Sequence, residues 1–305
     1  MLSSFPLYAS AALAQVMREN VKRMLSAGAD WRRREIRETA IDPVAVALVL
    51  VAAVVHATWN RVLHAEDDRV AAMSVAGLVV GVVLLPAVLV SPPWRVLPFV
   101  VASAMVEVAY AHCLSAAYRR GALSVAYPLG RGVAPLLVTL GGWLLLSQRP
   151  EAGALIGALS LAVGLALIAV AGGRAGQWGA VGFALLTGLT IAAYSVVDAG
   201  AVRQVSPVGY LGAVLGIQGV LLTLLMRGKR TRLRRGLRSG ALIAVGLVGG
   251  YLLVLFAFQM APAGRVSTLR ESSVLVGLML SGERPSRAVW TGAILVLVGA
   301  LLAAS

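Results

Sequence analysis

Long runs of apolar residues follow one another along nearly the whole chain, separated by short stretches that contain charged residues and proline. Each run is about 20 residues long, which is the length a helix needs to cross the hydrocarbon core of a bilayer. The runs are continuous and do not alternate between apolar and polar residues, so they predict helices and argue against a closed β-barrel. The pattern predicts an all-α polytopic membrane protein with ten transmembrane helices, at roughly 43–63, 70–90, 97–117, 122–146, 152–171, 178–198, 207–226, 241–259, 264–281 and 286–304.

The two halves of this pattern resemble each other. The segment 146–168, LSQRPEAGALIGALSLAVGLALI, parallels the segment 280–302, LSGERPSRAVWTGAILVLVGALL. Positions that match at a spacing of 135 residues are Arg149 and Arg284, Gly157 and Gly292, Gly164 and Gly299, and Trp59 and Tyr194. Because five helices per half is an odd number, the second copy would enter from the opposite side, which predicts two inverted five-helix repeats, 43–171 and 178–304. Chance similarity between glycine-rich apolar helices is the alternative.

Composition supports a membrane protein and argues against several classes of enzyme. The chain has 305 residues, of which 59 % are hydrophobic and 13 % charged, whereas about 25 % are charged in a typical soluble domain. The single cysteine, Cys113, provides neither an internal disulfide nor a cysteine metal site. Phosphate-binding loops and hydrolase or metalloprotease motifs are absent from the sequence, and its three histidines are scattered. We expect no enzymatic activity, no metal and no cofactor.

The net charge of +14 is concentrated in two places. Seven basic residues and no acid fall between Arg227 and Arg238, inside a predicted basic loop 227–240. The extension 1–42 is also rich in arginine, and we expect it to be flexible or to lie on the membrane surface. Such segments usually meet lipid headgroups, and we expect no nucleic acid as a partner because almost all of the chain is membrane-spanning.

Arg131 lies in the segment AYPLGRGVAPLL, residues 126–137, in the middle of the fourth predicted span. Pro128 and Pro135 flank it, and each proline removes a backbone donor from the helix. Protein or water can satisfy the freed carbonyls, but lipid cannot, so we expect this segment to be a broken, cavity-lining part of its span. Arg131 would contact an anionic solute or a gate, or would form a structural ion pair with Glu107 or Glu271.

Three acids inside the predicted spans are candidates for proton coupling: Glu107, Asp198 and Glu271. A buried carboxylate that can change its protonation state is what a proton-coupled carrier requires. Asp198 lies near the end of its predicted span and is alternatively an interfacial group. Arg270 and Glu271 are adjacent on one helix and therefore point about 100° apart, so we expect one to face a cavity and the other a neighbouring helix.

A polar and aromatic stripe marks the first predicted span. His56 and Asn60 are four residues apart and share a helix face, which Trp59 borders. The stripe lines a solute path or, alternatively, forms interhelical hydrogen bonds. Together with the charged positions, the sequence predicts a substrate cavity lined by His56, Trp59, Asn60, Glu107, Tyr110, Tyr127, Arg131, Tyr194, Arg270 and Glu271.

Several of these motifs resemble the drug/metabolite transporter (DMT) superfamily, in particular its EamA-type permeases. HATWN at 56–60 is similar to the signature of that family's first helix, and YPLGRGVAPLL at 127–137 to its fourth helix. The turn LSQRP resembles the family's Gly-Glu-Arg turn with Gln148 in the glutamate position, and GERP at 282–285 keeps the glutamate. The resemblance covers about 43–305 and implies a ten-helix carrier that moves small solutes such as amino acids, other metabolites or drugs, often outward.

The charges of the loops give conflicting indications of orientation. If the ends of the ten-span region face the cytoplasm, the inner loops hold few basic residues and the outer loops hold many. The inner residues are Arg95, Arg149 and Arg203; the outer ones are Arg69, Arg119, Arg120, Arg174, those of the basic loop, Arg284 and Arg287. The positive-inside rule favours the reverse. The basic extension and the usual arrangement of the resembled family favour cytoplasmic ends.

The sequence thus predicts a secondary transporter, and an exporter in particular, that moves a small polar or amphipathic metabolite across the cell membrane by alternating access at a midplane cavity. Membrane lipids are expected partners, and a Gly-x-x-x-Gly spacing at Gly153 and Gly157 allows a homodimer as well as packing within the bundle. Replacing Arg131 by alanine is expected to remove transport without preventing membrane insertion. The alternative is a non-transporting membrane scaffold or sensor that uses the basic loop to bind acidic lipid or a partner.

Overall fold

The computed structural model describes residues 41–120, 123–172, 178–280 and 286–304. These residues form a bundle of helices and contain no strand. The basic extension expected at 1–42 falls almost wholly outside the described residues. The helices are α2 (Pro43–Ala65), α3 (Arg69–Val83), α4 (Leu85–Val90), the short 3₁₀ turn η1 (Trp94–Val96), α5 (Leu97–Arg120), α6 (Leu123–Leu146), α7 (Ala152–Gly172), α8 (Trp178–Ala201), α9 (Pro207–Leu225), α10 (Lys229–Arg235), α11 (Leu237–Met260), α12 (Ala263–Arg270), α13 (Ser273–Leu280) and α14 (Arg287–Ala304).

Local sequence explains where several helices begin. The Asp42 carboxylate accepts a hydrogen bond from the Val44 N–H at 2.7 Å, and Pro43 occupies the first position of α2, where its missing donor costs nothing. The Asp68 carboxylate caps α3 in the same way through Ala71. Pro207 likewise opens α9. Capping aspartates and prolines therefore set the starts of helices whose interiors are almost entirely apolar.

Seven of the described helices are long and apolar enough to cross a membrane, which confirms a multi-pass membrane protein. They lie at 43–65, 94–120, 152–171, 179–201, 207–225, 237–260 and 287–304. The other three expected spans correspond to α3 with α4, to α6, and to α12 with α13. Ten crossings therefore stays a prediction.

The expected break in the fourth span was wrong. The backbone of α6 is helical throughout Leu123–Leu146, including both proline positions. Each proline removes only one N–H, and neighbouring groups in a bundle can satisfy the single carbonyl that is left. The break lies instead between α12 and α13, where Glu271 and Ser272 donate to carbonyls three residues earlier and tighten the helix into a turn.

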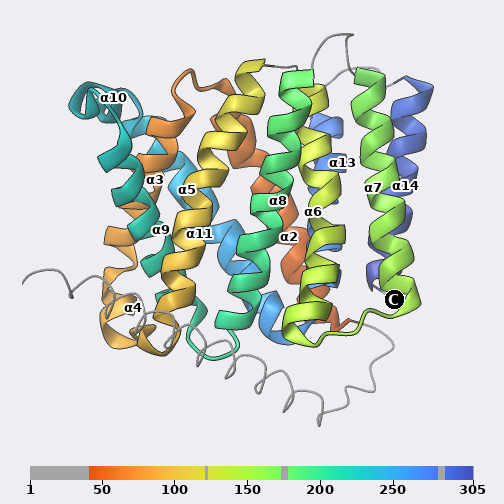
Figure 1. Cartoon of the computed structure of the whole chain (residues 1–305), viewed down its shortest axis with the longest axis horizontal. Helices are drawn as coiled ribbons and strands as arrows, with labels where there is room; N and C mark the ends of the chain where they lie inside the picture. Colours follow the sequence, from red (N-terminus) through yellow and green to blue (C-terminus); the bar gives the residue numbers. More distant parts are fainter. Residues whose placement is uncertain (1–40, 121–122, 173–177, 281–285, 305) are drawn as a thin grey trace, which may run out of the picture.

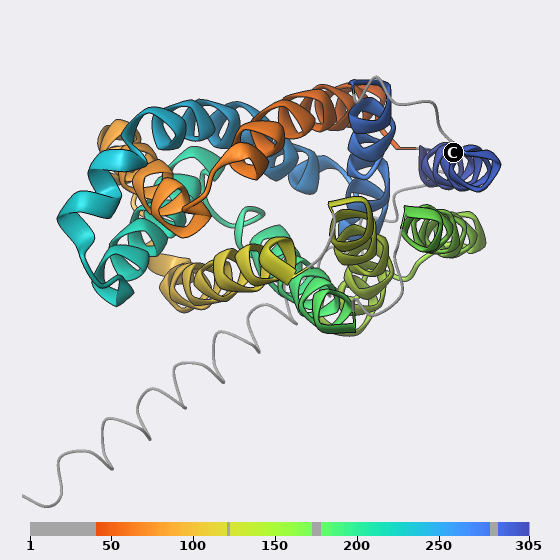
Figure 2. The ribbon, with the colours of Figure 1, turned by 90° about the horizontal axis from the view of Figure 1, so that it is seen from above.

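The bundle has two long sides with a pair of helices at one end. Seen from above, α2 and α11 pack along one side, and α5, α8 and α6 along the other (Figure 2). Helix α3 packs against α9, and α7 packs against α14 at the end where the chain terminates (Figure 1). Helix α10 lies at the far end, beside α3.

Glycines allow α7 and α14 to touch backbone to backbone. A Cβ added at Gly157 would lie 2.8 Å from the Gly299 carbonyl oxygen, and one added at Gly164 would lie 2.6 Å from the Gly292 carbonyl oxygen. A similar approach joins α3 and α9, where a Cβ on Gly81 would lie 2.6 Å from the Gly216 Cα. Small residues at these points serve helix packing inside the bundle.

Candidate functional site

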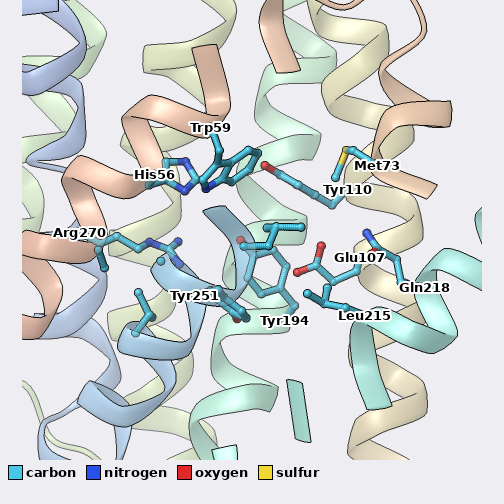
Figure 3. Close-up of a pocket in the computed structure, with 14 residues that line it drawn as sticks. His56, Trp59, Met73, Glu107, Tyr110, Tyr194, Leu215, Gln218, Tyr251 and Arg270 are labelled. Atoms are coloured by element: carbon cyan, nitrogen blue, oxygen red, sulfur yellow. The ribbon is translucent and has the colours of Figure 1, made fainter. Parts of the chain in front are cut away.

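A cavity lies near the centre of the bundle, between its two long sides (Figure 3). It encloses about 30 Å³, which is room for about two water molecules. Helices α2, α3, α5, α8, α9, α11 and α12 all contribute to its wall. The residues that line it are Ala52, His56, Trp59, Met73, Glu107, Tyr110, Tyr194, Leu215, Gln218, Leu247, Gly250, Tyr251, Val254 and Arg270.

Aromatic rings form much of the wall. Tyr194 of α8 contacts Tyr110 of α5 and Tyr251 of α11 edge to face, with ring centroids 5.8 and 5.9 Å apart. Trp59 contacts the His56 ring in the same manner at 4.6 Å. Edge-to-face packing of this kind holds large side chains in fixed orientations. The rings therefore give the cavity a defined shape.

Arg270 brings a buried positive charge to this wall. Its side chain comes from the last residue of α12, is 3 % exposed and points toward the centre of the cavity (Figure 3). Among the described residues, its Nε and Nη2 atoms have no hydrogen-bond partner, and its Nε lies 3.7 Å from the Glu271 carboxylate. A buried guanidinium with free donors is costly unless another group binds it.

Glu107 brings a negative charge to the same space. It lies on α5, is 6 % exposed, and points into the cavity beside Tyr194 and Gln218 (Figure 3). Within the described part of the chain, no hydrogen bond or ion pair reaches its carboxylate. Oppositely charged side chains with unused hydrogen-bonding capacity therefore line one cavity.

The side chain of Arg131 does not line the central cavity. Its Nη1 donates to both carboxylate oxygens of Glu271, at 2.9 and 3.0 Å, and both side chains are buried. Its Nη2 donates to His56 Nε2, which requires a neutral ring that carries its proton on Nδ1. The structure therefore shows the ion-pair alternative for Arg131, and it joins α6 to the break after α12.

The Asp198 carboxylate is buried and accepts several hydrogen bonds, so it is not an interfacial group. One carboxylate oxygen accepts hydrogen bonds from the Ser103 and Tyr210 hydroxyls, at 2.6 and 2.7 Å, and the other accepts one from the Tyr251 hydroxyl. The side chain is completely buried, and its donors come from α5, α9 and α11. Asp198 therefore ties three helices to α8 directly behind the cavity wall.

The comparisons with known proteins agree with this architecture. Residues 178–305 match the model of the EamA-like transporter family. The matched residues make up the second half of the chain, from α8 to α14. The resemblance to EamA-type permeases is thus confirmed over these residues, and the family is one of membrane transporters, not of enzymes.

A crystal structure of another protein has a fold similar to that of this chain. It is 18 % identical in sequence, has a TM-score of 0.64, and the match covers 85 % of this chain and 95 % of the other. This similarity shows that the two proteins share a fold over most of this chain. The curated proteins contain no match.

The bundle brings together most of the sequence-predicted site residues. His56, Trp59, Glu107, Tyr110, Tyr194 and Arg270 line the central cavity. Asn60 and Arg131 line a smaller adjacent cavity of about 10 Å³, which Tyr110 also borders. Glu271 pairs with Arg131 outside the central cavity, and the side chain of Tyr127 lies outside the described residues.

Sequence reasoning missed Tyr251, Gln218 and Met73, which also line the cavity. Gln218 is 1 % exposed within the apolar helix α9, and its Oε1 has no hydrogen-bond partner among the described residues. The signal that would have found it is a lone amide in an otherwise apolar span. No group of three or more metal-ligating side chains lies together in the described part of the chain.

Gln148, in the position of the family's turn glutamate, has a structural contact. Its Oε1 accepts a hydrogen bond from the Ala263 N–H at 2.9 Å, at the first residue of α12. The N–H groups of a first helical turn have no partner within the helix. The turn after α6 in the first half thus caps a helix of the second half.

Proposed function

We propose that the chain is a secondary transporter of the cell membrane that exports a small polar solute through alternating opening of the central cavity to the two sides. The observation that carries this proposal is a central cavity lined by two buried residues of opposite charge, Arg270 and Glu107. Among the described residues, two nitrogen atoms of Arg270 have no hydrogen-bond partner, although its Nε lies 3.7 Å from Glu271. A family model of transporters matches the second half of the chain. The export direction rests on the resemblance to EamA-type permeases.

The pairing of helices supports two inverted repeats of five. If α2 corresponds to α8 and α5 to α11, then the contact of α2 with α11 is the counterpart of the contact of α8 with α5. Helices α3 and α9 would be counterparts that touch each other, as would α7 and α14. The glycines agree, because Gly157 meets the counterpart of Gly164, and Gly164 meets the counterpart of Gly157. Exchange of this kind is what a two-fold relation requires.

The cavity suggests the chemistry of the solute. Arg270 offers free donors suited to a carboxylate, and Glu107 offers acceptors suited to a cationic group. Aromatic rings between these charges suit an apolar or cationic portion of the solute. We therefore favour a small solute that carries both charges, or an anion. Because the cavity has room for only about two water molecules, such a solute enters only when the helices separate.

Among the acids considered for proton coupling, the contacts favour Glu107. Three hydroxyls bind Asp198, and Arg131 binds Glu271, so both carboxylates already have compensating partners. Glu107 faces the cavity with no such partner in the described chain. In the transporter we propose, Glu107 exchanges its proton for the solute as the cavity changes sides.

The test is a comparison of metabolites in cells and medium. Cells that produce the unmodified chain are compared with cells that produce Glu107→Gln or Arg270→Gln, at equal amounts in the membrane. Arg95→Gln, at an exposed arginine that does not line the cavity, is the matched control. We expect a solute that accumulates in the medium with the unmodified chain and the control, and not with either cavity variant.

Either of two results would contradict the proposal. One is a solute shift that both cavity variants keep in full. The other is that the unmodified chain shifts no solute in several hosts and transports no member of a panel of purified solutes in proteoliposomes. The second result would favour the scaffold alternative, in which the basic segment around α10 is the functional part of the protein.

A further inference from the structure

Helix α10, which makes up most of the segment 227–238, lies at one end of the bundle (Figure 1). The segment carries seven basic residues and no acid, and we call it the basic surface. Its cationic side chains are exposed except for Arg232, which is partly buried. Among the described residues, none forms a hydrogen bond or ion pair with six of these cations: Arg227, Lys229, Arg230, Arg234, Arg235 and Arg238. The surface therefore presents several unneutralised charges side by side.

The seventh cation fixes this surface to the bundle. Arg232 Nε and Nη2 donate to the two carboxylate oxygens of Asp68, at 2.6 and 2.8 Å. Hydrogen bonding to this guanidinium holds the pKa of the Asp68 carboxyl below its ordinary value, so the pair stays charged at neutral pH. Leu233 packs against the apolar core of the bundle. Arg230 and Arg234, four residues apart, share the helix face turned away from the Asp68 contact.

The position of α10 indicates what it meets. It follows directly after Leu224 and Leu225, large apolar residues at the end of α9 that are exposed on the outside of the bundle. Leu237, at the start of α11, is exposed as well. Exposed apolar side chains on a membrane-spanning bundle face lipid tails, so the cations directly beyond them lie at the depth of the headgroups.

Among the described residues, the opposite end of the bundle has no comparable cluster of exposed cations. Of its basic side chains, Arg203 donates to the carbonyls of Phe258 and Ala261, and Arg265 pairs with Glu151. Arg95 and Arg149 are exposed but isolated in sequence. Anionic lipids and the excess of basic loop residues are both features of the cytoplasmic side.

We propose that the exposed cations of 227–238 bind anionic phospholipid headgroups of the cytoplasmic leaflet. The α10 end of the bundle then faces the cytoplasm. The start of α2 and the end of α14, which lie together at the other end, face outward. This inference stands on the surface and its charge, and is independent of the transported solute.

Lipid binding can be measured on the full chain purified in neutral detergent. Phosphatidylglycerol or phosphatidylcholine is titrated, and lipid-bound protein is quantified by native mass spectrometry. The variant Arg230→Gln/Arg234→Gln/Arg235→Gln is compared with the matched control Arg95→Gln/Arg149→Gln. We expect the affinity for phosphatidylglycerol to fall on the order of fivefold for each α10 cation removed, and to stay unchanged in the control.

Unchanged affinity of the α10 variant would overturn the proposal, as would equal binding of phosphatidylcholine. Displacement of phosphatidylglycerol by millimolar inorganic phosphate would also overturn it, because the surface would then be a site for free phosphate. All substituted side chains are exposed, and equal unfolding temperatures in neutral detergent show that both variants are folded.

The orientation has its own test in whole cells. In a background in which Cys113 is replaced by alanine, Thr231→Cys places a thiol on α10, and Ser91→Cys places one on an exposed residue at the opposite end. A membrane-impermeant maleimide is expected to label position 91 in intact cells and position 231 only after permeabilisation. Labelling of position 231 in intact cells would overturn the inference.

Discussion

At the scale of single residues, partners decide what each buried charge does. Arg131 and Arg270 are both almost fully buried, but Arg131 is bound by Glu271 and His56, whereas two nitrogen atoms of Arg270 have no hydrogen-bond partner in the described chain. The first arrangement stabilises one packing of helices. The second leaves a charge available to a solute, at an energetic cost that binding would relieve.

This difference changes what is expected of Arg131→Ala. Removing Arg131 leaves the buried Glu271 carboxylate with only the longer 3.7 Å ion pair to Arg270. Because breaking a buried ion pair costs about 3–5 kcal/mol, the variant should unfold well below the temperature of the unmodified chain. The double variant Arg131→Met/Glu271→Leu removes both charges and should recover part of that loss, because it also takes from the buried Arg270 its ion pair with Glu271. Thermal unfolding in detergent measures both effects, and a double variant no more stable than Arg131→Ala would show that the pair is not the cause.

The sequence predicted which residues lie close together more accurately than it predicted the role of each residue. Adjacent positions on a helix point apart, and the structure does place Arg270 in the cavity wall and Glu271 against Arg131. Asp198 was misjudged because the expected span ended at 198, whereas α8 continues to Ala201 and buries that carboxylate among three hydroxyls. Hydroxyl donors on distant helices leave no local trace in a sequence.

At the scale of elements, the apolar pattern located the helices but not their breaks. Prolines in 126–137 suggested a broken helix, yet α6 continues through them, and the tight turn falls at Glu271 and Ser272, where no proline or glycine marks it. The turn follows Arg270 directly. Tertiary contacts of Arg131 with Glu271 thus hold a local geometry that helix propensity does not predict.

The glycine contacts of α7 with α14 give a prediction at this scale. Gly164→Ala would place its Cβ 2.6 Å from the Gly292 carbonyl oxygen, so the helices must separate, at a cost of about 1–3 kcal/mol. Gly182→Ala in α8 is the matched control, because nothing lies within 4 Å of its added Cβ. Thermal unfolding in detergent should show a clear loss for the first variant and none for the second; equal losses would contradict the packing argument.

At the scale of the whole molecule, the helices of the bundle meet in two different ways. Direct backbone contacts through glycine join α3 to α9 and α7 to α14, whereas side chains line the cavity between them. A cavity of about 30 Å³ is far smaller than the roughly 300 Å³ or more of a typical small-molecule site. A transporter with this structure must therefore open by moving its long sides apart.

Alternating opening predicts that a cavity position is reachable from both sides of the membrane. In a chain whose Cys113 is replaced by serine, Ala52→Cys places a thiol in the cavity wall, and Ala184→Cys places one at a fully buried site outside that wall. A membrane-impermeant methanethiosulfonate should label position 52 slowly in both right-side-out and inside-out vesicles, because labelling waits for opening, and should leave position 184 unlabelled. A scaffold with a fixed structure would expose position 52 to one side or to neither. Labelling from a single side, at any reagent concentration that leaves position 184 untouched, would therefore contradict alternating access.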